Sequence, residues 1–301
     1  MFSFGHCLAV QNSPPPDSDI RIAHHHSLPG PTSGEIDQGL ASNAFSPYYQ
    51  PIFRLLDGCI CGAEVLARWP HPRLGLLTPV SFLPLLEAHR HADALLARLF
   101  ARMFEQGLAL QQELMMRRAP PVRLAFNVQL GQIAGATFVD DIREALAKTG
   151  LPAAGLTFEV IESGPGLAPA QLAPLLANME RLRSMGCGLA MDDLGQGHSS
   201  LARLCRYPFS QLKLDAVFVR ALDHSSTSRA VVRAALSLAR ELGIELVAEG
   251  IETDTQRRCL IDMGCEVGQG FLLAPPLPHD KLVAHLRRDD TTALSASLLA
   301  S

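Results

Sequence analysis

Strand-like and helix-like segments alternate from residue 46 to about residue 275 of this 301-residue chain, and this alternation limits the possible folds more than any other feature. Most strand-like segments are separated by stretches with helical character, at residues 79–117, 140–149, 169–185, 226–242 and 255–263. The eight apolar segments that are typical of strands read SPYYQPIFRL, CICGAEVLARW, VRLAFNV, LTFEVIE, GLAMDDL, QLKLDAVFV, ELVAEGI and EVGQGFLLA. Repeated strand-then-helix units of this length predict a closed barrel of mainly parallel strands.

The first connection departs from that pattern. Only a few residues separate the first two strands, and Asp57-Gly58 among them is a strong signal for a two-residue hairpin. Parallel neighbours would need a crossover of about a dozen residues or more. We therefore predict an α/β fold, a TIM-like (β/α)8 barrel in which the first strand runs antiparallel to the others.

The regions outside the alternating part differ in composition. Residues 1–44 are rich in Pro, Ser, Gly and His and show no sustained period of a helix or a strand. We interpret them as a disordered leader, residues 45–287 as the barrel domain and residues 288–301 as a C-terminal tail.

Composition excludes several classes of function. The formal net charge is −4 and 19% of residues are charged, so we expect no broad surface for duplex nucleic acid. The seven cysteines are an odd number without a CxxC pair, which favours reduced thiols over zinc or a redox dithiol. No apolar run approaches the roughly 20 residues of a membrane span, and no signal peptide is evident, so we predict a soluble, cytoplasmic protein without a membrane span.

Acidic side chains recur where the predicted strands end. In a barrel of this kind the active site lies at the carboxyl ends of the strands. Any one of these acids alone is as readily a solvated strand end or a helix cap. Together they would crowd one rim, where like charges stay ionised only if cations share the space. The polar residues at these positions are Glu64, Asn127, Glu159, Glu162, Asp192, Asp193, Asp215 and Glu249.

Oxygen-only ligands of this kind suit Mg²⁺ or Mn²⁺ better than zinc. The adjacent pair Asp192 and Asp193, at a strand end, can present carboxylates to two ions about 3.5–4 Å apart, the spacing used in phosphoryl chemistry. Lys213 lies in the strand QLKLD, whose alternation places it with Asp215 toward the barrel axis. There it can activate or stabilise a nucleophile, although a structural salt bridge that fills the barrel is the alternative.

Seven separated motifs, taken together and in order, resemble the EAL-domain phosphodiesterases that hydrolyse cyclic di-GMP. The resemblance covers about residues 46–285. The motifs are YYQPI, GAEVLARWPHPRLGLLTP, FNV, FEVIES, DDLGQGHSSLARLCRYPFSQLKLD, VAEGIET and GCEVGQGFLLAPPLP.

The resemblance implies a role for each matching position. It implies a metal-dependent hydrolase with two Mg²⁺ or Mn²⁺ ions per site, a cyclic di-GMP substrate that is cleaved to linear pGpG, and a homodimer. The implied metal ligands are Glu64, Asn127, Glu159, Asp192, Asp193 and Asp215. The implied catalytic residues are Lys213, Glu249 and Glu162, the last as the anchor of the glycine loop that follows the two aspartates. The implied substrate contacts are Gln50, Arg68 and Gln269, with Gln269 also in the metal-and-water network.

The sequence also departs from the family pattern. Val65 replaces the usual alanine of the Glu-Ala-Leu triplet, and Leu194, Gln196 and His198 replace the usual Phe, Thr and Tyr of the loop. These loop changes support one alternative, a catalytically weak or inactive receptor or protein-interaction module. An unrelated metal-dependent barrel enzyme of the aldolase or enolase type would share the acids but would not predict the ordered motifs.

Overall fold

The computed structural model describes residues 30–119, 121–161, 167–194 and 200–287. These residues form two compact units. The first comprises the described part of Met1–Ser46 together with Ala67–Arg102, and the second comprises Pro47–Leu66 together with the described part of Met103–Ser301.

The second unit contains a closed ring of eight paired strands. Around the ring the order is β1, β9, β8, β7, β6, β5, β4 and β2, and β2 pairs with β1 to complete it. The strands are β1 (Ser46–Arg54), β2 (Ile60–His71), β4 (Arg123–Gln129), β5 (Leu156–Ile161), β6 (Gly188–Leu194), β7 (Gln211–Leu214), β8 (Glu245–Ala248) and β9 (Val267–Gly268).

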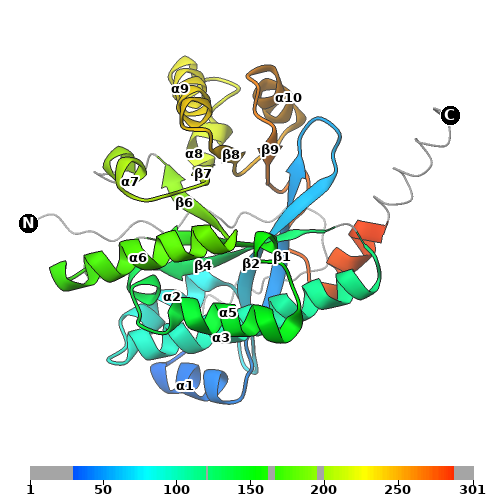
Figure 1. The fold of residues 1–301 in the computed structure, drawn as a ribbon. Coiled ribbons are helices and arrows are strands. Elements are labelled where there is room, and N and C mark those ends of the chain that lie inside the picture. The colour runs from blue at the N-terminus through cyan, green and yellow to red at the C-terminus, as the bar shows by residue number, and fades with distance from the viewer. Residues whose placement is uncertain (1–29, 120, 162–166, 195–199, 288–301) are drawn as a thin grey trace, which may run out of the picture. The chain divides into compact units, whose positions relative to one another are not determined.

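Strand β1 is antiparallel to β9, whereas each successive pair around the ring from β2–β4 to β8–β9 is parallel. The turn between β1 and β2 contains Gly58 at a φ of +72°, a conformation that glycine adopts without strain. Figure 1 shows β1 and β2 as one long hairpin. The predicted TIM-like barrel with an antiparallel first strand is confirmed.

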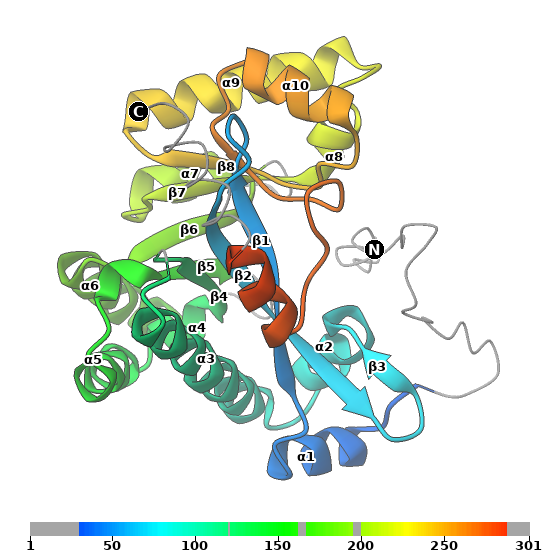
Figure 2. The ribbon, with the colours of Figure 1, turned by 90° about the vertical axis from the view of Figure 1, so that its right-hand side faces the viewer.

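Helices of the second unit follow the strands around the ring. Figures 1 and 2 show α5 beside α6, and α9 beside α10. These helices are α4 (Leu130–Ile133), α5 (Phe138–Thr149), α6 (Pro169–Met185), α7 (Ser200–Arg206), α8 (Ala216–Arg220), α9 (Ser226–Leu242) and α10 (Asp254–Asp262), with a 3₁₀ turn η1 at Ala153–Gly155. Helix α3 (Ala92–Met116) begins among the residues of the first unit and ends among those of the second.

Local sequence explains why α9 has these bounds. The Ser225 side chain accepts a hydrogen bond from the Ser228 backbone N–H, and Gly243 ends the helix in the left-handed conformation. The residues that the helix buries recur at intervals of three and four, as an amphipathic helix requires: Val232, Ala235, Leu236 and Ala239.

Three predicted elements differ from the structure. The helix predicted over 79–117 is two helices, α2 (Pro79–Glu87) and α3, because the His89 ring accepts a hydrogen bond from the His91 backbone and stabilises a turn between them. The strand predicted over 211–219 ends at Leu214, because Asp215 caps a helix there. The last strand, predicted over 266–274, pairs only at Val267–Gly268.

The first unit contains α1 (Ser33–Ala41), α2, the short strand β3 (Gly75–Leu77) and the end of β2. Its centre is aromatic: the Phe45 ring stacks on Trp69 at 4.9 Å between centroids and meets Phe82 edge-on at 5.1 Å. Gly39 of α1 lies against the Trp69 ring, where an added Cβ would come within 3.0 Å. Close packing of this kind holds α1 on the aromatic cluster.

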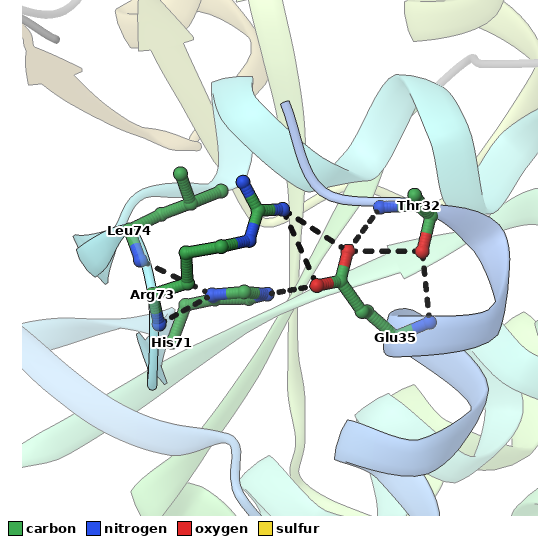
Figure 3. Close-up of polar contacts among 5 residues, drawn as sticks. All are labelled: Thr32, Glu35, His71, Arg73 and Leu74. Atoms are coloured by element: carbon green, nitrogen blue, oxygen red, sulfur yellow. Dashed lines mark hydrogen bonds and ion pairs between the residues drawn. The ribbon is translucent and has the colours of Figure 1, made fainter. Parts of the chain in front are cut away.

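Helix α1 lies within the range that the sequence analysis assigned to a disordered leader, residues 1–44. It forms because Thr32 caps it in a reciprocal capping box with Glu35, and because Ile36 and Leu40 are buried. Figure 3 shows the Glu35 carboxylate between Thr32 on one side and His71 and Arg73 on the other. Hydrogen bonds from Thr32 lower the pKa of Glu35 to about 2, so this carboxylate stays charged. Residues 1–29 and 288–301 lie outside the described residues.

Candidate active site

Five polar side chains of the second unit converge where neighbouring strands end. Glu64, Glu159, Asp192 and Lys213 lie on β2, β5, β6 and β7, and Glu249 directly follows β8. Because these strands are parallel, their carboxyl ends meet at one rim of the barrel. Of the acids that the sequence analysis placed at this rim, the structure brings Glu64, Glu159, Asp192 and Glu249 together around Lys213.

Lys213 lies at the centre of this cluster. Its Nζ is 2.7 Å from Glu249 Oε1, 2.8 Å from Glu159 Oε2, 3.4 Å from Asp192 Oδ1 and 3.5 Å from Glu64 Oε2. The Lys213 side chain is 3% exposed and that of Glu159 is fully buried. One buried ammonium therefore offsets part of the mutual repulsion among these four carboxylates.

Two amide side chains extend the network. Gln269 Nε2 donates to Glu64 Oε2 at 2.9 Å and to Glu249 Oε1 at 3.3 Å, so it bridges two acids that are distant in the sequence. Asn127 Nδ2 donates to Glu64 Oε1 at 3.0 Å. Each oxygen of Glu64 thus accepts a hydrogen bond from an amide, and Oε2 also lies 3.5 Å from Lys213 Nζ.

The adjacent aspartates occupy an irregular part of β6. Met191 pairs with Leu212, but the next pairing joins Leu194 to Leu214, so β6 holds one more residue than β7 over this stretch. A bulge of this type re-aims side chains that regular alternation would send to opposite faces. Asp192 lies within this irregular stretch, and the side chain of Asp193 lies outside the described residues.

Burial and charge perturb the acids in different directions. Burial and the neighbouring Glu64 hold the pKa of Glu159 well above its usual value, and burial raises the pKa of Glu249 to about 8. Burial acts in the same direction on Glu64, but Lys213 and the amide donors outweigh it and lower its pKa. Burial acts to lower the pKa of Lys213, yet the surrounding acids outweigh it and hold that pKa well above its usual value. The cluster thus contains an ionised acid, two acids that protonate readily and a permanent cation.

The donor chemistry of this cluster fits a divalent metal ion. Glu159 Oε1 and Gln269 Oε1 are buried without a hydrogen-bond partner, although a buried polar atom usually has one. The available donors are all carboxylate or amide oxygens, which hard ions such as Mg²⁺ and Mn²⁺ prefer. Among the described side chains, no group of three or more acids, histidines or cysteines is arranged to hold a metal ion, and the ammonium of Lys213 lies among the carboxylates.

The remaining predicted residues have the following contacts and burial, where the structure describes them. Asp215 is buried and its Oδ1 accepts a hydrogen bond from Val217 N at 2.6 Å, so it caps α8. Gln50 is a half-buried residue of β1. Arg68 is a buried residue of the first unit, and it donates from Nη1 to the Ala67 carbonyl at 3.0 Å. Glu162, Gln196 and His198 lie outside the described residues.

Comparison with known proteins identifies the family. The family model of the EAL domain matches residues 33–276, which is most of the chain. The chain belongs to the EAL domain family. Because the match begins at residue 33, it includes α1 as well as the barrel.

Known relatives share this region. The chain is 45% identical over 248 residues to the cyclic di-GMP phosphodiesterase RocR of Pseudomonas aeruginosa. The aligned region covers 82% of this chain and 61% of RocR. The chain thus spans about three fifths of the length of that relative. The cyclic di-GMP phosphodiesterase NbdA of the same organism is 37% identical over 257 residues, 84% of the chain and 31% of NbdA.

Solved structures of other proteins have a similar fold. The PaMucR phosphodiesterase in complex with c-di-GMP superposes with a TM-score of 0.74 at 35% identity, over 83% of this chain and 98% of that one. The EAL enzyme Bd1971, bound to cAMP and cyclic di-GMP, gives a TM-score of 0.75 at 26% identity, over 84% of this chain and 67% of that one.

In the described ranges, no helix of this protein has the length and apolar character needed to cross a bilayer.

Proposed function

We propose that this chain is a metal-dependent phosphodiesterase that hydrolyses cyclic di-GMP to linear pGpG. The observation that carries the proposal is the set of buried or largely buried carboxylates around Lys213 at the carboxyl ends of the barrel strands. Family membership supports it, as do the phosphodiesterase activity named for RocR and the c-di-GMP bound to PaMucR.

The acids and the amide at the rim would hold the metal. Glu64, Asn127, Glu159 and Asp192 lie together and offer oxygen ligands, and the resemblance adds Asp193 and Asp215 as ligands of a two-ion site. When bound, Mg²⁺ or Mn²⁺ ions would polarise the phosphodiester and make an attacking water more acidic. Their positive charge would also offset the mutual repulsion of these carboxylates.

Lys213 and Glu249 have complementary roles in this proposal. Because its pKa is raised, Lys213 stays protonated and acts as a hydrogen-bond donor that stabilises negative charge on the phosphoryl oxygens. Burial raises the pKa of Glu249 to about 8, so near neutral pH this acid is mostly protonated without metal and must lose its proton before it can act as a general base. Glu249 Oε1 lies 2.7 Å from Lys213 Nζ, and this contact favours the deprotonated form that accepts the proton.

The other assignments rest on the resemblance alone. Arg68 and Gln50 are proposed to contact the substrate, and Glu162 is proposed to anchor the loop after the aspartates. Gln269 is proposed to contact the substrate as well, although its amide hydrogens are directed to Glu64 and Glu249.

The domain and its surroundings complete the proposal. We place the start of the domain at residue 33 instead of 45, because α1 is helical and the family match begins there. A homodimer and a cytoplasmic location are part of the proposal. The free thiols of the described cysteines are compatible with a reducing compartment.

A hydrolysis assay tests the function. Purified full chain is incubated with cyclic di-GMP and Mg²⁺ or Mn²⁺, and the products are separated by chromatography. We expect pGpG with metal, none with EDTA, and none from a Glu64→Gln variant, which keeps the side-chain size but loses the charged ligand. No pGpG with either ion would overturn the proposal, and tight nucleotide binding without cleavage would favour the receptor alternative.

A further inference from the structure

Gly250 directly follows Glu249 and lies unusually close to helix α8. Its φ is +67°, and a Cβ added there would lie 2.4 Å from the Cβ of Ala216 and 3.1 Å from its Cα. Carbon atoms in ordinary contact are about 3.5–4.0 Å apart. Any side chain at position 250 would therefore require a displacement of about 1 Å or more.

The segment that contains Gly250 is held by backbone contacts. Glu249 N donates to Leu214 O at 3.1 Å, and Ile251 N donates to Gln269 O at 3.1 Å. A Cβ at Gly270 would lie only 2.2 Å from the backbone N and O of Ile251, so these two chain segments are in direct contact. The segment cannot shift without disturbing the end of β7 or the turn that carries Gln269.

Helix α8 is fixed as well. Asp215 Oδ1 accepts from Val217 N at the start of the helix, and Gln256 of α10 donates to the carbonyl of Arg220 near its end. Ala216 is 9% exposed and lies three residues beyond Lys213. A displacement at Ala216 is therefore transmitted along the backbone toward Lys213.

We propose that the contact between Gly250 and Ala216 sets the separation of Glu249 from Lys213. Gly250 and Ala216 are then positioning residues of the active site. Each sits next to the strand end that delivers one member of the pair, whose Nζ and Oε1 are 2.7 Å apart. This inference rests on the proposed function, because it takes these two groups to be catalytic. Neither residue touches substrate; each acts through the side chain it places.

The chain offers a matched control. Gly243 has a φ of +64°, close to that of Gly250, but a Cβ there would meet nothing within 4 Å. Replacing either glycine by alanine introduces the same backbone strain, and only Gly250→Ala adds the clash. We expect Gly250→Ala to lower kcat about 100-fold, the effect typical of a 1 Å misplacement of catalytic groups, with a small change in KM. We expect Gly243→Ala to keep the kcat of the wild type.

A compensating change separates positioning from simple damage to the fold. In the double variant A216G/G250A the closest contact is removed, so we expect kcat to rise at least about tenfold above that of Gly250→Ala. Crystal structures of the variants should show the distance from Lys213 Nζ to Glu249 Oε1 lengthened in Gly250→Ala and restored in the double variant.

The inference is overturned if Gly250→Ala keeps wild-type kcat, if Gly243→Ala loses as much, or if the double variant shows no rescue. If the wild type does not hydrolyse cyclic di-GMP, the proposed function fails by itself. The Lys213–Glu249 distance in the crystal structures then decides the positioning contact: an unchanged distance in Gly250→Ala refutes it, and a lengthened one supports it.

Discussion

Replacing Lys213 by methionine removes the one cation at the centre of the described cluster while keeping most of the side-chain volume. Its Nζ lies within 3.5 Å of oxygens from four different acids. At an effective dielectric constant of about 20, one such pair is worth about 5–6 kcal/mol before the cost of desolvation. The net cost of removing one partner of a buried ion pair is smaller, about 3–5 kcal/mol.

That cost translates into a measurable loss of stability. For a chain of this size about 2–4 °C of Tm corresponds to 1 kcal/mol, so we expect Lys213→Met to lower Tm by about 6–20 °C in EDTA. The loss should be larger at pH 9 than at pH 6, because the acids can relieve their repulsion by taking up protons only at the lower pH. Mg²⁺ should raise the Tm of the variant more than that of the wild type, since the ion replaces the missing charge.

Differential scanning calorimetry with and without Mg²⁺ measures these effects. Lys148→Met is the matched control, because Lys148 forms an exposed ion pair with Glu144, and its loss should change Tm little. A Lys213→Met protein with wild-type Tm in EDTA at pH 9 would refute the view that the ammonium holds the acids together.

Three further predictions concern single sites. Burial raises the pKa of Glu249 to about 8 from an ordinary 4.5. Its contribution to the free energy of unfolding is therefore complete below about pH 4.5 and is lost as the pH rises through 8. In EDTA, the Tm of the wild type should fall more steeply from about pH 6 to 9 than the Tm of Glu249→Gln. Gly107→Ala would place a Cβ 2.6 Å from the Phe126 ring, so denaturant titration should show a loss of about 1–3 kcal/mol. Arg123→Met breaks a half-exposed pair with Glu245 and should cost no more than about 1 kcal/mol in the same titration, with kcat unchanged.

Local signals in the sequence were sufficient to predict much of the fold. The bounds of α6 and α9 agree with the predicted ranges 169–185 and 226–242, because each helix ends at a glycine in the left-handed conformation. The antiparallel first strand followed from Asp57-Gly58, since a two-residue turn leaves no room for a crossover.

Other features depend on contacts that the sequence does not reveal. The strand that contains Lys213 was expected to continue past Asp215, but Asp215 Oδ1 accepts a hydrogen bond from Val217 N and caps α8, a local contact that competes with continued pairing and ends β7 at Leu214. Gln269 reaches Glu64 across 205 positions, and no spacing rule predicts such a pair. Helix α1 was missed because Pro- and Ser-rich neighbours hide a short amphipathic segment whose burial depends on Trp69 and Phe45.

The position of the metal tests the account most directly. A crystal grown in Mn²⁺ and measured at the manganese absorption edge locates the ions without reference to activity. The account predicts anomalous peaks that place manganese ions within coordination distance of oxygens of Glu64, Glu159 and Asp192. It predicts no such peaks in a Glu64→Gln crystal. Manganese bound elsewhere in the protein, or carboxylates that still surround Lys213 with no ion among them at saturating Mn²⁺, would contradict it.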